Sequence, residues 1–204
     1  MAESVLGSLQ PEVGIGAPDT GRSFSIVPLA SLPVVAVFLG GLVVAIATNT
    51  YWAIDFFHVV GGGIWTALDL FLGFVLGPIL GGLSVPARTE FTKRFMPKMV
   101  VIMPTIVVAT LAAGFQLARH LGFLSMSHTH HSWVVASMIV VGIMGVVALG
   151  LLEPANIAVL VELRKPRPDG LVIQKLMKRF IYTAGITGAM QVVTLIIMTR
   201  LATL

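Results

Sequence analysis

The chain has 204 residues, of which 56% are hydrophobic and only 11% are charged, and its mean hydropathy is +0.97. Soluble domains carry about 25% charged residues, so this composition excludes an ordinary soluble domain and favours an integral membrane protein. The absence of cysteine excludes a disulfide scaffold, an iron–sulfur cluster and a thiolate copper site. The net charge of +4 does not indicate nucleic-acid binding, because most basic residues lie beside apolar segments.

Residues 1–25 are polar and contain several prolines and glycines, and we interpret them as an N-terminal arm that does not cross the membrane. Five apolar segments follow, and a membrane-crossing helix needs about 20 such residues. They lie at about 27–49, 54–83, 99–119, 133–162 and 179–199. The sequence therefore predicts an all-α, multi-pass integral membrane helical bundle of five transmembrane helices.

Small residues and prolines mark two of the spans. A ladder with a spacing of four, which permits close helix approach, occupies the second span. Its members are Gly73, Gly77 and Gly81. The run from Gly61 to Gly63 either packs in the same way or leaves room for a flat ligand. Pro78 and Pro154 lie inside the second and fourth spans, so we expect both helices to bend there.

A polar stripe follows one face of the second span. At 100° per residue, His58, Gly62, Trp65 and Asp69 fall within one narrow sector, which should face the bundle interior rather than lipid. His58 is either a haem or metal ligand or the donor of an interhelical hydrogen bond, and Trp65 would flank a bound group. Asp69 lies near the membrane midplane, where a carboxyl is expected to be protonated or to have a partner.

Glu153, in the fourth span, is a second carboxyl at membrane depth. Together Asp69 and Glu153 are candidates for a proton relay that leads towards the outer side. The alternative is that each is a protonated group that only forms hydrogen bonds.

The third span ends at Arg119 and His120, at a depth similar to that of His58. A haem between His58 and His120, with Arg119 on a propionate, is a reasonable arrangement, because histidine is a common haem ligand. The alternative is that Arg119 and His120 meet water and lipid headgroups.

The loop after the third span is the most metal-like stretch. It contains Met126, His128, His130 and His131 within six residues. Imidazole with thioether suits copper, and imidazole alone also suits zinc or nickel. Exposed histidine-rich loops also bind metal adventitiously, so both interpretations stay open.

The basic residues predict the orientation. Eleven of the thirteen lysines and arginines lie in the arm, in the loops at 84–98 and 163–178, or next to them. With five spans these segments share one side, which the positive-inside rule makes cytoplasmic. The N-terminus is then cytoplasmic, and all five histidines and the C-terminus lie on the outer side.

The segment from His58 to Trp65 reads H-V-V-G-G-G-I-W. It resembles the H-x6-W opening of two related families of small membrane proteins, the copper resistance protein D-like domain and the HemJ-type protoporphyrinogen oxidase. The resemblance continues in the basic stretch before the third span, in Pro104 and Gly114, and in the basic run from Lys175 to Arg179. It covers about residues 54–200.

This resemblance implies a four-helix core that binds haem b, with the histidine matching His58 as an axial ligand. The copper family implies copper uptake instead. The HemJ-type enzymes carry a lysine early in the helix that matches the fourth span. The stretch from Trp133 to Val141 has none, which counts against protoporphyrinogen oxidation.

The sequence therefore supports two possible functions. The first is a haem b or copper protein of the membrane that acts in electron transfer or metal handling, with other membrane subunits as partners. The second is a non-catalytic accessory subunit of a larger membrane complex. The residues do not decide whether the protein is an enzyme.

Overall fold

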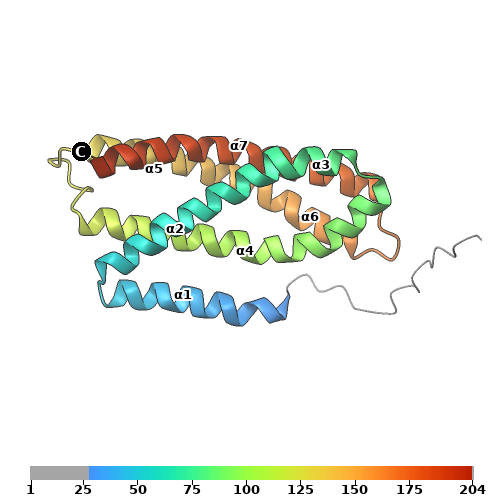
Figure 1. Ribbon diagram of the computed structural model, residues 1–204, viewed down its shortest axis with the longest axis horizontal. Helices are drawn as coiled ribbons and strands as arrows, with labels where there is room; N and C mark the ends of the chain where they lie inside the picture. The colour runs from blue at the N-terminus through green and yellow to red at the C-terminus, as the bar shows by residue number, and fades with distance from the viewer. Residues whose placement is uncertain (1–27, 204) are drawn as a thin grey trace, which may run out of the picture.

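The computed structural model describes residues 28–203, and every regular element within them is helical, which confirms the all-α prediction (Figure 1). The elements in chain order are η1 (Leu29–Ser31), α1 (Leu32–Ala47), α2 (Tyr51–Leu70), η2 (Phe71–Leu76), α3 (Gly77–Gly82), α4 (Val85–His120), α5 (His131–Val147), η3 (Ala148–Leu152), α6 (Glu153–Leu163) and α7 (Gly170–Thr203). The arm predicted at 1–25 lies outside the described residues.

Four helical rods are long and apolar enough to cross a membrane. They are Tyr51–Gly82, Val85–His120, His131–Leu163 and Gly170–Thr203. The apolar α1 is shorter, and its 16 residues span about 24 Å. Four long apolar helices and one short one fit the expected membrane bundle.

The rods run back and forth between two ends of the bundle (Figure 1). The turn between α1 and α2, the segment between α4 and α5, and the last turn of α7 lie at one end, which we call the histidine end. The turn between α3 and α4 and the loop between α6 and α7 lie at the other, which we call the basic end. The five histidines lie at or near the histidine end, as the sequence predicts.

Two predicted loops are largely helical instead. The stretch at 84–98 belongs to α4, which begins at Val85, and the stretch at 163–178 is reduced to a short turn before Gly170. Apolar composition predicts which part of a helix can lie in lipid. It does not predict the residue at which the helix begins or ends. The extension of α4 is held by buried Thr92 and Met96, and on its exposed face by an ion pair in which Arg94 donates to Glu90 at 2.8 Å.

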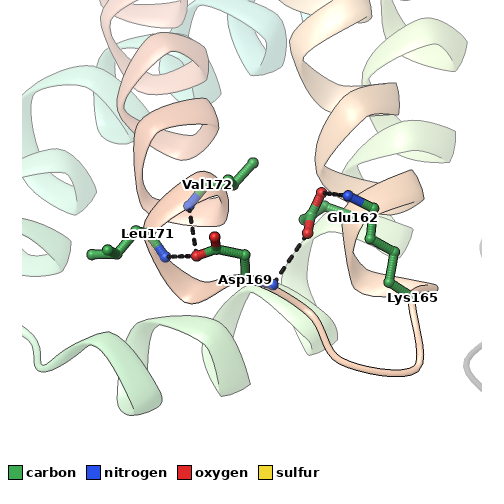
Figure 2. A network of polar contacts seen from close by, with 5 residues as sticks. All are labelled: Glu162, Lys165, Asp169, Leu171 and Val172. Atoms are coloured by element: carbon green, nitrogen blue, oxygen red, sulfur yellow. Dashed lines mark hydrogen bonds and ion pairs between the residues drawn. The ribbon is translucent and has the colours of Figure 1, made fainter.

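The turn between α6 and α7 is fixed by two carboxylates (Figure 2). Asp169 Oδ1 accepts from the backbone N–H of Leu171 at 2.8 Å, which satisfies a free donor at the start of α7. Glu162 Oε1 accepts from the N–H of Asp169 at 3.1 Å, while its Oε2 pairs with Lys165. These contacts explain why so short a turn joins two long helices.

Both prolines at which the sequence predicts a bend follow a π-helical segment. Pro78 lies two residues after the end of η2, and Pro154 lies two residues after the end of η3. Proline has no N–H and its ring crowds the preceding turn, and a wider π turn accommodates both effects. By contrast, α4 continues through Pro97 and Pro104 as one α-helix.

The rod from Tyr51 to Gly82 crosses the bundle diagonally, so its two halves meet different helices (Figure 1). Near the histidine end, Gly61 faces the Thr110 side chain of α4. Near the basic end, Gly73 lies against the Gly185 backbone of α7, and Gly77 against Ile181. Close packing is therefore confirmed for these glycines, whereas a Cβ at Gly81 would meet no atom within 4 Å.

Candidate functional sites

His58 lies half-buried on α2 at its crossing with α4. Its Nδ1 donates to the backbone carbonyl of Thr110 at 3.0 Å. A Cβ on Gly114 would lie 2.5 Å from His58 Cε1, so only glycine leaves room for the ring there. In a neutral imidazole whose Nδ1 carries the hydrogen, Nε2 holds a free lone pair. This is the arrangement in which a histidine is oriented by one nitrogen and can ligate a metal with the other.

His120 does not converge with His58. It is exposed at the end of α4, where its Nδ1 donates to Asn49 Oδ1 at 3.2 Å and its ring lies 5.6 Å from that of Tyr51. Six residues, or about 9 Å of helix rise, separate it from the turn of α4 that contacts His58. The two histidines therefore do not form a pair of axial ligands in this arrangement. Arg119 is also exposed.

The histidine loop brings two of its imidazoles together. The rings of His128 and His130 have centroids 5.2 Å apart, and the backbone N–H of His130 donates to His128 Nδ1 at 3.1 Å. His131 is directed elsewhere, with its Nδ1 donating to the carbonyl of Phe123 at 3.2 Å. Met126 is 89% exposed. Within residues 28–203 no three His, Cys, Asp or Glu side chains are close enough to hold one metal ion.

Asp69 is buried, with an exposed fraction of 1%, and its partners lie on α7. Its Oδ2 accepts from Gln191 Nε2 at 2.7 Å and from Thr187 Oγ1 at 3.1 Å. Its Oδ1 and the Oε1 of Gln191 are buried and have no hydrogen-bond partner among residues 28–203. Two buried acceptor oxygens of this network therefore lack a hydrogen-bond donor. No cation pairs with Asp69 within residues 28–203.

Trp65 lies in a methionine-rich cluster, away from the ring of His58. It packs with buried Met99 and Met103 of α4 and Met144 of α5. Seven residues, about 10 Å of helix rise, separate it from His58. Trp65 and Asp69 are buried and His58 is half-buried, so the predicted stripe does face the interior.

Glu153 begins α6 and is half-buried. The hydrogen bonds of Asp69 lead to α7 and none reaches Glu153, so no direct hydrogen bond links the two members of the predicted relay. Nearby on α6, Asn156 is 1% exposed, and neither of its amide atoms has a hydrogen-bond partner within the described residues 28–203.

Several buried polar residues of the long helices were not identified from the sequence. Thr183, Thr187 and Gln191 recur every four residues along α7, and this spacing was the available signal that one face of the helix is polar and buried. Arg88 was counted only as a topological charge, although it is 7% exposed.

Comparisons of the chain with models of known protein families, with curated proteins and with solved structures found no match in any of the three.

Proposed function

We propose that the protein binds haem b through His58 and acts in electron transfer or metal handling within a membrane complex. The observation that supports this is the hydrogen bond from His58 Nδ1 to the Thr110 carbonyl, because a histidine oriented through one ring nitrogen can ligate a metal with the other. The haem would supply a one-electron couple. The chain would supply one ligand, held in one tautomer over Gly114.

The orientation is part of this proposal. Ten of the twelve basic residues between 28 and 203 lie at or near the basic end. We infer from the positive-inside rule that this end is cytoplasmic and that His58 lies towards the outer side. A redox partner would then approach from the outer side.

The test is the visible absorption spectrum and metal content of the protein purified in mild detergent. A Soret band that sharpens on reduction, absent from His58→Ala and kept by His120→Ala, would support the proposal. His120 is the matched control, because its side chain is exposed and forms a hydrogen bond with Asn49, whereas His58 lies at the crossing of α2 and α4. Loss of the band in both variants would contradict a site built on His58 alone.

Copper at the histidine loop is the second candidate, and the 5.2 Å separation of the His128 and His130 rings favours it. Stoichiometric copper without a Soret band, lost from a His128→Ala/His130→Ala double variant, would support this candidate. A folded protein with neither signal would leave an accessory subunit as the better explanation.

A further inference from the structure

Arg88 is a buried cation without an anionic partner. It lies in the first turn of α4 with 7% of its surface exposed. Its Nε donates to the carbonyl of Leu80 at 2.8 Å, and its Nη2 donates to those of Gly81 at 3.2 Å and Leu83 at 2.9 Å. Its Nη1 donates no hydrogen bond, and no carboxylate pairs with it, within residues 28–203.

The backbone contacts neutralise only part of this charge. The carboxyl end of a helix carries the equivalent of roughly half a negative charge. The helix end that Arg88 caps therefore offsets its positive charge only in part, and burying an unpaired charge is costly. An anion bound from outside the chain would remove this cost.

Arg88 lines a groove of about 780 Å³ between α7 and the segment formed by η2 and α3. Gly73, Gly77 and Gly81 line it from one rod, and Gly185 lines it from α7. Along α7 the lining runs from Gln174 to Ala189, about 22 Å of helix. Half of a hydrocarbon core is about 15 Å thick, so the groove is long enough to reach from headgroup depth to the midplane.

A second cation lines the groove at its basic end. Lys178 is exposed, and its Nζ lies 5.7 Å from the centre of the Tyr182 ring, which also lines the groove. Lys178 pairs with no carboxylate within residues 28–203. The groove therefore has two cations at headgroup depth and small or apolar residues below them.

We propose that this groove binds one anionic phospholipid, with its phosphate at Arg88 and Lys178 and an acyl chain over the glycines. Apart from the two cations, most of the lining consists of glycines and apolar side chains, which suit an acyl chain. Two unpaired cations also favour an anion over an apolar segment, and cytoplasmic leaflets carry anionic lipids.

The experiment measures lipid retention by native mass spectrometry, and thermal unfolding in detergent with phosphatidylglycerol or phosphatidylcholine of identical chains. We expect one phosphatidylglycerol to be retained and to raise the Tm, and phosphatidylcholine to do neither. Equal effects of the two lipids would overturn the proposal. So would an equal rise in Tm with inorganic phosphate, because it would make the groove irrelevant.

Two matched pairs of variants locate the site. Gly81→Leu should abolish retention, while Gly82→Leu should not, since a Cβ at either meets no atom within 4 Å but only Gly81 lines the groove. Lys178→Gln should weaken phosphatidylglycerol binding about fivefold, the effect of one basic residue at a membrane surface. Lys175→Gln, outside the groove, should weaken it less.

Equal lipid affinities within either pair would refute the site. A partner protein cross-linked through a photoreactive residue at position 81, with no lipid retained, would show that the groove holds a helix.

Discussion

Replacing Gly114 by alanine tests how His58 is held. The added Cβ would lie 2.5 Å from His58 Cε1 and 2.6 Å from Nδ1, whereas non-bonded heavy atoms prefer about 3.5–4 Å. Both close atoms belong to the rigid ring, and Gly114 lies inside α4, so the helix cannot easily yield. We expect the ring to swing away and to lose its 3.0 Å hydrogen bond to Thr110.

Three effects set the size of the loss of stability. A lost hydrogen bond costs about 0.5–1.5 kcal/mol. Overpacking costs about 1–3 kcal/mol. Alanine in a helix recovers about 0.5–1 kcal/mol relative to glycine. The net expectation for Gly114→Ala is a free energy of unfolding lowered by about 1–3 kcal/mol.

The assay is reversible unfolding in mixed detergent micelles, with Gly63→Ala as the control. Gly63 lies on α2, and a Cβ there meets no atom within 4 Å, so its replacement should leave stability unchanged or slightly higher. If haem binds at His58, Gly114→Ala should also weaken it about 10–100-fold, the usual effect of disturbing the group that orients a ligand. Equal stability of the two variants would refute the described contact. Unchanged haem affinity in a destabilised Gly114→Ala would refute the role of the Thr110 hydrogen bond.

Three further predictions concern the contacts of α7. Gly73→Ala should destabilise the protein by about 1–3 kcal/mol in the same unfolding assay, because its Cβ would overlap the backbone of Gly185. Asp69→Leu and Gln191→Leu should each lower the free energy of unfolding. The double variant should lose less than the sum of the two single losses, by a coupling energy of about 0.5–2 kcal/mol. Additive losses would argue against the 2.7 Å hydrogen bond between the two side chains. Asp169→Ala should cost about 0.5–2 kcal/mol and speed hydrogen exchange in the first turn of α7, through loss of the helix cap.

The sequence predicted the helical bundle and its polar face because both follow from periodicity along one helix. The stripe from His58 to Asp69 needs only the 100° turn per residue, and the structure buries Trp65 and Asp69 as expected. The helix ends could not be predicted in this way. Polar residues such as Arg94 fall outside an apolar segment, although an i,i+4 ion pair continues the helix through them.

The partners of the candidate site residues required three dimensions. Nothing in the amino-acid sequence indicates that His58 meets Thr110 and Gly114, or that His120 meets Asn49. A bis-histidine site was reasonable from similar depth alone. The structure shows that similar depth is not enough to bring two side chains together. Residues on α4 that differ by six positions also point in different directions.

The polar pair at membrane depth and the glycine contact beside it fix the register between α2 and α7. Asp69 reaches Gln191, and one turn along the same rod Gly73 meets Gly185. A shift by one residue would place a side chain against the Gly185 backbone and leave a buried carboxyl without its donor, so both contacts oppose it. His58 lies on the same continuous helix as Asp69. A shift of α2 along α7 would therefore also move the imidazole of His58 away from Thr110 and Gly114 of α4.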